Sequence, residues 1–307
     1  MIVSCGEAVV DFLPVKTANG GTAYRPQPGG APFNVANAVA RLGVPAGFFG
    51  GLSTATFGTM LRASLAASGV DLAFAASVAR PSTLPFVSFD GGDERYAFFD
   101  EGSAGRMLTE NDLPAFPTAV TALHFGSLSL AQEPCGSAFE ALMKREQRDR
   151  VISLDPNVRP EMIKNRDGYL ARIDRMIEMT DVVHLSRSDL AYLAPGADFA
   201  SVASTWIGRG AKLIVLTKGA EGAEARSRSA SARVAVPAAE VVDTVGAGDA
   251  FTGALLVHWH ETRRLTKDAL AGLAAKEIEA ALAFATKAAA VSVSRAGADS
   301  PWLREVR

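Results

Sequence analysis

Residues 242–251, with the sequence VDTVGAGDAF, decide the fold of this chain. The stretch follows a β-branched run and leads into an apolar segment that predicts a helix. The backbone amides of Gly246, Ala247 and Gly248 are expected to lie unpaired at that helix's N-terminus, where the helix dipole adds positive charge. Such a terminus binds anions, and Asp249 stands beside it, placed to accept a proton from an attacking group. The combination predicts phosphoryl transfer.

Two other glycine patterns do not fit this stretch. A dinucleotide fingerprint requires a third glycine three positions after Gly248, where Phe251 stands. A Walker sequence requires Lys and then Ser or Thr after its second glycine, whereas Asp249 stands there. Taken alone, the stretch is equally compatible with a tight turn that Asp249 caps.

Composition excludes several classes of protein. The chain has 307 residues, of which 48% are hydrophobic and 21% charged, as in an ordinary globular protein. Its net charge of -2 predicts no nucleic-acid partner, and no apolar run approaches the roughly 20 residues that cross a bilayer, so no membrane partner is expected. Cys5 and Cys135 predict buried free thiols, and the N-terminus lacks a charged leader, so we expect a cytoplasmic protein.

Short apolar segments alternate with helical ones along the chain. Strands are predicted at 2–5, 122–125, 151–154, 182–185 and 213–216. Helices are predicted at 33–42, 57–68, 137–148, 169–179, 186–193, 201–207, 250–259 and 267–291. This alternation predicts an α/β fold with a parallel sheet covered on both faces, in one domain spanning 1–307.

Two stretches interrupt the alternation. Residues 12–28 show no helical period, and residues 83–99 predict two strands around Asp90-Gly91-Gly92-Asp93, a hairpin sequence. We expect the segments at about 12–28 and 83–105 to form a small antiparallel β lid. Its Phe-rich strands need cover from a substrate or a second subunit, so a homodimer through the lid is expected. A further hairpin is predicted near 226–236.

Three motifs together carry a family resemblance. They are Gly29-Gly30-Ala31-Pro32-Phe33-Asn34-Val35-Ala36, Asp155-Pro156-Asn157-Val158-Arg159 and residues 243–251. They resemble the PfkB (ribokinase-like) carbohydrate kinases, most closely the fructokinase branch, over about residues 6–297. The resemblance implies a three-layer α/β/α ribokinase-like fold with a small β lid, and ATP as the phosphate donor.

The resemblance assigns roles at the sugar site. Asp249 would be the catalytic base and contact the sugar hydroxyl, while the amides of Gly246, Ala247 and Gly248 would stabilise charge on the transferring group. The other proposed sugar-binding residues are Asp11, Gly29, Gly30, Asn34 and Arg159. Without the resemblance, Asp11 is as readily a turn residue and Arg159 a solvated loop residue.

The resemblance also implies a nucleotide site and two metal sites. Thr217, Gly219 and Gly222, with Ser186 and the cradle glycines Gly246 and Gly248, would contact ATP, although a plain β-turn explains the first glycines equally well. Where the family has Asn-x-x-Glu, this chain has Ser186-Arg187-Ser188-Asp189, so the implied contact of Asp189 with Mg²⁺ through water is in doubt. The positions that match a monovalent-cation (K⁺) site are Asp243 and the backbone carbonyls near Val245, Ser292 and Gly297.

The predicted function is transfer of the γ-phosphate of ATP to a primary hydroxyl of a small sugar, with D-fructose and fructose 6-phosphate as the best pair. The alternatives are a 2-keto-3-deoxygluconate kinase, a nucleoside kinase of the same fold, and a sugar- or nucleotide-binding regulator without catalysis. His258 and His260 are two residues apart on a helix and form no metal pair. His124 and His184 end strands and are predicted to be packing residues.

Overall fold

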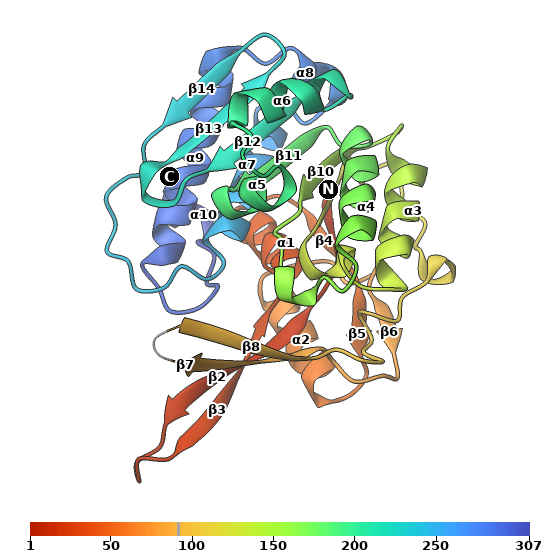
Figure 1. The fold of residues 1–307 in the computed structure, drawn as a ribbon, viewed down its shortest axis with the longest axis vertical. Helices are drawn as coiled ribbons and strands as arrows, with labels where there is room; N and C mark the ends of the chain where they lie inside the picture. The colour runs from red at the N-terminus through yellow and green to blue at the C-terminus, as the bar shows by residue number, and fades with distance from the viewer. Residues whose placement is uncertain (91–92) are drawn as a thin grey trace.

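An eight-stranded sheet forms the centre of the molecule (Figure 1). The computed structural model describes residues 1–90 and 93–307. The sheet has the order β14-β13-β12-β11-β10-β9-β1-β4. The bounds are β1 (Ile2–Cys5), β4 (Ala46–Phe49), β9 (Ala122–Gly126), β10 (Val151–Asp155), β11 (Val182–Ser186), β12 (Leu213–Thr217), β13 (Ala223–Ser227) and β14 (Ser231–Val234).

Six of these strands are parallel, as predicted, but the two strands at one edge of the sheet are antiparallel to their neighbours. The hairpin expected near 226–236 exists, and its strands β13 and β14 extend the sheet antiparallel to β12. The prediction of a purely parallel sheet was therefore wrong at this edge. A tight turn lets consecutive strands pair without a crossover helix, and the sequence gives no sign of which sheet the hairpin joins.

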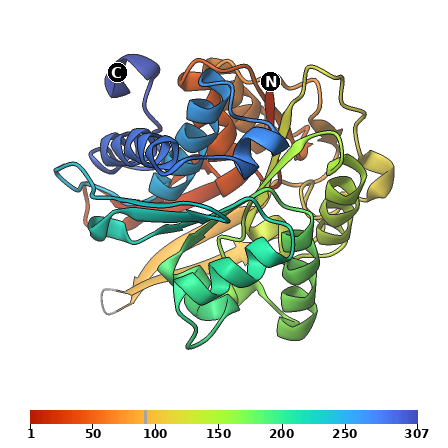
Figure 2. The ribbon, with the colours of Figure 1, turned by 90° about the horizontal axis from the view of Figure 1, so that it is seen from above.

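Helices cover both faces of the sheet (Figure 2). One core contains residues of α1 (Ala31–Arg41), α2 (Thr56–Ala67), α7 (Ala247–Glu261), α8 (Lys267–Ala271), α9 (Ala275–Val293) and α10 (Leu303–Val306). The other contains residues of α3 (Cys135–Glu146), α4 (Arg166–Glu178), α5 (Arg187–Leu193) and α6 (Phe199–Gly208). Alternation along each strand feeds both cores: Val182 faces the first, and Val183 faces the second.

The C-terminal helix predicted at 267–291 is two helices. The α8 helix ends at its C-cap Gly272, and α9 begins after Ala274, whose amide donates to Glu277 Oε2 (2.8 Å). Leu273 between them is buried in the core. An alanine-rich pattern favours helix throughout, so only the packing of Leu273 and the new cap reveal the break.

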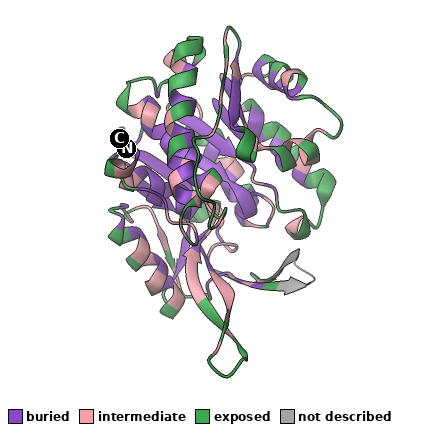
Figure 3. Ribbon diagram, turned by 90° about the vertical axis from the view of Figure 1, so that its left-hand side faces the viewer, coloured by how far each residue is buried: buried purple, intermediate pink, exposed green. Residues whose placement is uncertain are grey.

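A second, four-stranded sheet projects from the main body (Figure 3). Its order is β3 (Thr22–Gly29), β2 (Val9–Lys16), β7 (Leu84–Asp90) and β8 (Asp93–Phe99). The outer pairs are antiparallel as predicted, but β2 and β7 pair in parallel through Phe12 and Phe86, so the sheet is mixed. The predicted turn at Gly91-Gly92 lies outside the described residues.

The remaining elements are short. The strands β5 (Gly51–Ser53) and β6 (Ala76–Val78) pair in parallel. The 3-10 turns are η1 (Glu110–Asp112), η2 (Ser127–Leu130), η3 (Pro160–Met162) and η4 (Gly219–Glu221). Cys5 and Cys135 are buried free thiols, as predicted. Within the described ranges, no helix has the length and apolar character of a membrane span.

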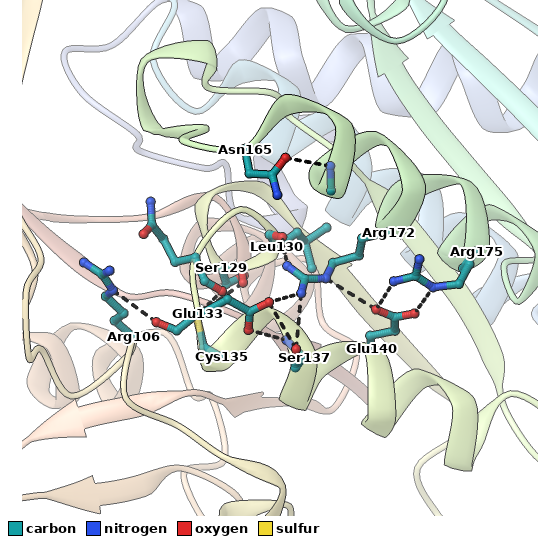
Figure 4. A network of polar contacts seen from close by, with 12 residues as sticks. Arg106, Ser129, Leu130, Glu133, Cys135, Ser137, Glu140, Asn165, Arg172 and Arg175 are labelled. Atoms are coloured by element: carbon teal, nitrogen blue, oxygen red, sulfur yellow. Dashed lines mark hydrogen bonds and ion pairs between the residues drawn. The ribbon is translucent and has the colours of Figure 1, made fainter.

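A polar network fixes the outer helices α3 and α4 against the chain that follows β9 (Figure 4). Arg172 on α4 donates to the carbonyl of Leu130 (2.9 Å) and forms an ion pair with Glu133. Glu140 on α3 accepts from Arg175 at 2.6 and 2.9 Å. Because Leu130 ends η2, the network holds the turn that begins with Ser127 at the edge of the cleft described below.

Candidate active site

A cleft of about 300 Å³ opens where the parallel strands end. Its walls come from the carboxyl ends of β9–β12, the N-termini of α1 and α7, and the small sheet. In an open α/β sheet, this edge is where ligands bind. Of the residues predicted from the sequence, the cleft is lined by Asp11, Gly30, Asn34, Arg159, Ser186, Asp189, Thr217, Val245, Gly246, Gly248 and Asp249.

The N-terminus of α7 forms one wall of the cleft. Its N-cap Gly246 has φ +76°, and a Cβ there would lie 2.6 Å from the Cβ of Ala298, so the turn requires glycine. In the described part of the chain, the amides of Gly246 and Gly248 have no recorded acceptor. The amide of Ala247, in contrast, donates to the Thr244 carbonyl at 3.3 Å. The predicted cradle is therefore two free amides, since the turn itself uses the third.

Asp249 lies in the first turn of α7, buried at the back of the cleft. Its Oδ2 accepts a hydrogen bond from Asn34 Nδ2 at 2.8 Å, which joins the N-termini of α1 and α7. Burial raises the pKa of Asp249 to about 7, against the lowering effect of the Asn34 hydrogen bond. A carboxyl group that titrates near neutrality can both hold and release a proton, as a general base must.

The small sheet supplies the opposite wall through Asp11. Burial raises the pKa of Asp11 to about 6, while the charge of Arg159 acts to lower it. A Cβ on Gly29 would lie 2.3 Å from Asp11 Oδ2, so the missing side chain of Gly29 makes room for this carboxylate. Gly29 is not among the described lining residues, and its predicted role of admitting a sugar to the backbone stays a prediction.

Gly30 does face the cleft, at the start of α1. Its φ is +106°, and a Cβ would lie 2.9 Å from the carbonyl oxygen of Glu7. Arg159 is exposed at the rim, where its Nη1 donates to Asn157 Oδ1 (2.6 Å). Asn157 itself has φ +38°, a left-handed conformation that Asn tolerates better than most residues.

The predicted nucleotide residues divide into two groups. Ser186 and Thr217 end β11 and β12 and line the cleft. Gly219 and Gly222 are not among its described lining residues. Gly222 has φ +95°, and a Cβ there would lie 1.9 Å from the Val234 carbonyl oxygen. The close approach of β14 thus explains why a glycine is needed at 222, and its predicted contact with ATP stays a prediction.

Comparison with known proteins agrees with this geometry. Residues 1–305 match the model of the pfkB family carbohydrate kinases. The chain belongs to this family. A curated fructokinase from Rhizobium leguminosarum bv. trifolii is 45% identical over 273 residues, covering 89% of this chain and 84% of that protein. The family resemblance found in the sequence is thus confirmed.

Solved structures of fructokinases superpose on this chain over nearly its whole length. A fructokinase with bound ATP from Xylella fastidiosa superposes with a TM-score of 0.91 at 30% identity, covering 99% of this chain and 96% of that one. A fructokinase double mutant from Vibrio cholerae O395, in a fructose, ADP and potassium ion bound form, gives a TM-score of 0.83 at 27% identity over 97% and 93% of the two chains. The predicted ribokinase-like α/β fold is confirmed.

The kinase uses Asp189, at the departure from the family motif, to hold its own backbone. Asp189 Oδ2 accepts from the amide of Ser186 (2.8 Å), and Oδ1 accepts from the amide of Val158 (2.7 Å). Burial raises the pKa of Asp189, and these hydrogen bonds oppose that effect. Asp189 thus caps α5 and fixes the loop that carries Arg159, with both carboxylate oxygens already in hydrogen bonds.

The residues predicted for a monovalent cation surround the loop that precedes α7. Asp243 accepts from the amides of Val245 (3.0 Å) and Gly297 (2.8 Å), so it joins the two chain segments. Ser292 Oγ is fully buried, and among the described residues it has no hydrogen-bond partner. An orphaned buried oxygen is compatible with a cation ligand. Among residues 1–90 and 93–307, no cluster of three His, Cys, Asp or Glu side chains is arranged for a metal.

Sequence reasoning missed three polar residues of the kinase cleft. Glu7 and Asp155 are buried there, and Glu7 Oε2 accepts from the amide of Ser129 (3.0 Å). His184 was predicted to be a packing residue, but it lines the cleft and binds Asp155. Their position was the available signal, because each of the three residues lies within two residues of the end of a predicted parallel strand.

Proposed function

We propose that this carbohydrate kinase transfers the γ-phosphate of ATP to the carbon-6 hydroxyl of D-fructose, giving fructose 6-phosphate and ADP. The observation that carries the proposal is the buried Asp249 carboxyl, held by Asn34 beside the free amides of Gly246 and Gly248. The fructokinases described above, at 27 to 45% identity, support fructose as the acceptor.

Each residue at the start of α7 has a defined role in the proposed reaction. Asp249 takes the proton of the sugar hydroxyl as its oxygen forms a bond to the γ-phosphorus. The bond from phosphorus to the β,γ-bridging oxygen breaks, and ADP leaves with that electron pair. The amides of Gly246 and Gly248, with the dipole of α7, stabilise the negative charge on the transferring group. Positioning and charge stabilisation supply most of the acceleration in such reactions.

The sugar is proposed to lie between the two walls of the cleft. Asp11 would accept hydrogen bonds from its hydroxyl groups, and Asn34 would donate to them. The sugar would lie above the backbone of Gly30, which has no side chain. Arg159 at the rim would contact the sugar or its new phosphate, and the four-stranded sheet would act as the lid that excludes water. ATP would lie along the ends of β11 and β12, against Ser186 and Thr217.

Two metal ions are part of the proposal. Mg²⁺ would neutralise the phosphates of ATP when bound, and Asp189, at the position that matches the family motif, would contact it through water. K⁺ would lie near Asp243, Val245, Ser292 and Gly297, where it would hold the loop that precedes α7. The buried unpartnered Ser292 Oγ supports the second site.

We also propose a homodimer through the small sheet. Phe99 is 63% exposed and Tyr24 42% exposed, while Phe12 and Phe86 stack between them with ring centroids 4.4 Å apart. Light scattering at micromolar concentration tests the dimer, and a monomer would reject it.

We further propose a cytoplasmic location, because the proposed reaction consumes ATP and the cytoplasm supplies ATP.

The decisive experiment is coupled measurement of ADP formation with a panel of acceptors: fructose, 2-keto-3-deoxygluconate, adenosine and no acceptor. We expect magnesium-dependent turnover with fructose, and product identified as the 6-phosphate. Preference for the keto-acid or the nucleoside would replace the substrate assignment. Tight sugar or nucleotide binding without turnover on any acceptor would instead support a regulator.

A further inference from the structure

Two buried histidines are each the third residue of a parallel strand, yet their surroundings differ. His124 on β9 contacts Ser153 Oγ through Nδ1 at 3.1 Å, and it is not among the described lining residues of the cleft. Burial lowers the pKa of His124 to about 4, so it is neutral at pH 7. His184 on β11 is buried as deeply but lines the cleft.

The hydrogen bonds of His184 are compatible with a doubly protonated ring. The hydroxyl of Thr217 lies within hydrogen-bond distance of both the carbonyl of Leu185 (3.2 Å) and His184 Nε2 (3.1 Å), and when it donates to Leu185 it accepts from Nε2. The Nδ1 of His184 lies 2.7 Å from the Asp155 carboxylate, which only accepts. In this arrangement both ring nitrogens carry hydrogen, as in an imidazolium paired with Asp155.

The electrostatic surroundings agree with a charged ring. Burial alone would lower the pKa of His184, but the charge of Asp155 and its hydrogen bond raise it overall. The acidic groups that act on it are Asp155, Asp189 on α5 and Asp249 on α7. The same ion pair holds the pKa of Asp155 below its ordinary value, although burial acts to raise it.

The ring of His184 lies directly under the first turn of α7. A Cβ on Gly248 would lie 4.0 Å from His184 Cε1, with no nearer atom. The ring stacks on Phe251 (centroids 5.2 Å apart, planes at 24°), and its Nδ1 lies 3.0 Å from Thr252 Oγ1. The ring thus lies beside Gly248 at the start of α7, in the wall of the cleft.

We propose that His184 is a positioning residue of phosphoryl transfer: its imidazolium neutralises Asp155 and adds positive charge beneath the amide cradle of α7. Without it, Asp155 would be a buried, unpaired negative charge facing the phosphates of ATP and the Asp249 base. Removing one partner of a buried pair has a large effect for this reason. The ring also ties the ends of β10 and β12 to α7, which keeps the cradle in place.

This inference rests on the proposed kinase activity, and the test separates the two. Turnover of fructose and calorimetric affinity for ADP are measured for the native protein, His184→Gln, Asp155→Asn and the double variant. For His184→Gln, we expect kcat to fall by roughly 10- to 100-fold and ADP binding to weaken, with the KM for fructose within about twofold. The double variant removes both charges, so we expect it to recover at least about half of the lost affinity for ADP on a logarithmic scale.

The matched control is His124→Gln, a buried histidine on β9 outside the cleft, which we expect to keep native kcat and ADP affinity. Circular dichroism and thermal melting establish that each variant is folded, and His184→Lys provides a second variant that keeps the charge if His184→Gln does not fold. Native turnover in His184→Gln would overturn the inference. So would a double variant that binds ADP no better than the single one, because the histidine would then act by packing alone. Absence of turnover in the native protein on every acceptor would instead reject the proposed function.

Discussion

The helices α1 and α7 both begin with glycines near the cleft, but these glycines have different structural roles. At α1, the two glycines avoid clashes within the protein. A side chain at Gly29 would clash with the Asp11 carboxylate, and one at Gly30 would clash with the carbonyl oxygen of Glu7. At α7, Gly246 meets the same kind of internal limit, against Ala298, whereas a Cβ on Gly248 would contact nothing closer than 4.0 Å. A glycine with free space around it in the protein alone marks the place where a ligand is expected. The two helix starts meet in the hydrogen bond from Asn34 to Asp249.

The largest effect is expected at the carboxyl group that joins the two helix starts. Asp249→Asn keeps the shape and the contact with Asn34 but removes the base, so kcat should fall by roughly 10³-fold or more while the protein stays folded. The coupled assay measures this. The exposed N-cap of α6 offers a control, since Asp198→Asn changes a carboxylate at a helix N-terminus away from the cleft and should keep native kcat. Undiminished turnover in Asp249→Asn would end the account of Asp249 as base.

Two alanine substitutions at α7 distinguish a glycine that leaves room for a ligand from a glycine that the fold itself requires. Gly248→Ala should fold normally but lower kcat/KM for ATP by roughly 10²-fold, because the methyl group occupies the cradle. Gly246→Ala forces an alanine to φ +76° against Ala298 and should destabilise the protein by at least about 1 to 2 kcal/mol. Urea unfolding and steady-state kinetics on both variants measure the difference. A Gly248→Ala enzyme with native kinetics would show that ATP does not approach this amide.

The pH dependence follows from the raised pKa of Asp249, about 7. A base must be deprotonated, so kcat/KM should fall about tenfold for each pH unit below that pKa and level off above it. Stability should show the opposite trend. The folded carboxyl holds its proton up to a higher pH than the unfolded one, so ionisation disfavours folding as pH rises from about 4 to 7. The advantage of Asp249→Asn in unfolding free energy should therefore grow over that range, and a constant difference would contradict the assigned pKa.

The smallest effect is expected at α1. In Gly29→Ala, the new methyl group displaces the Asp11 carboxylate, so the KM for fructose should rise about fivefold, with the KM for ATP unchanged. Asp11→Asn provides the comparison, because it weakens the same contact without added volume. Equal changes in both KM values would indicate that α1 as a whole has moved rather than Asp11 alone.

The cleft also shows how far the sequence could lead. The motif at 243–251 predicted Asp249, and the structure places it buried at the N-terminus of α7, beside Asn34 from a motif more than 200 residues away. The amide of Ala247 is bonded to Thr244 rather than free, and Gly222 is required by the close approach of Val234. In both cases a glycine-rich turn has its own hydrogen bonds and close contacts, and these are invisible in a list of residue types.

The sequence by itself determined the strands and helices of the central layer and the family of the chain, because apolar periodicity and short glycine motifs are local properties. Only the tertiary structure decided the parallel pairing of β2 with β7, the contact of His184 with Asp155 and the hydrogen bonds of Asp189 at the start of α5. These depend on contacts between segments far apart in the chain, and a buried group takes its protonation and its role from the partners that folding brings to it.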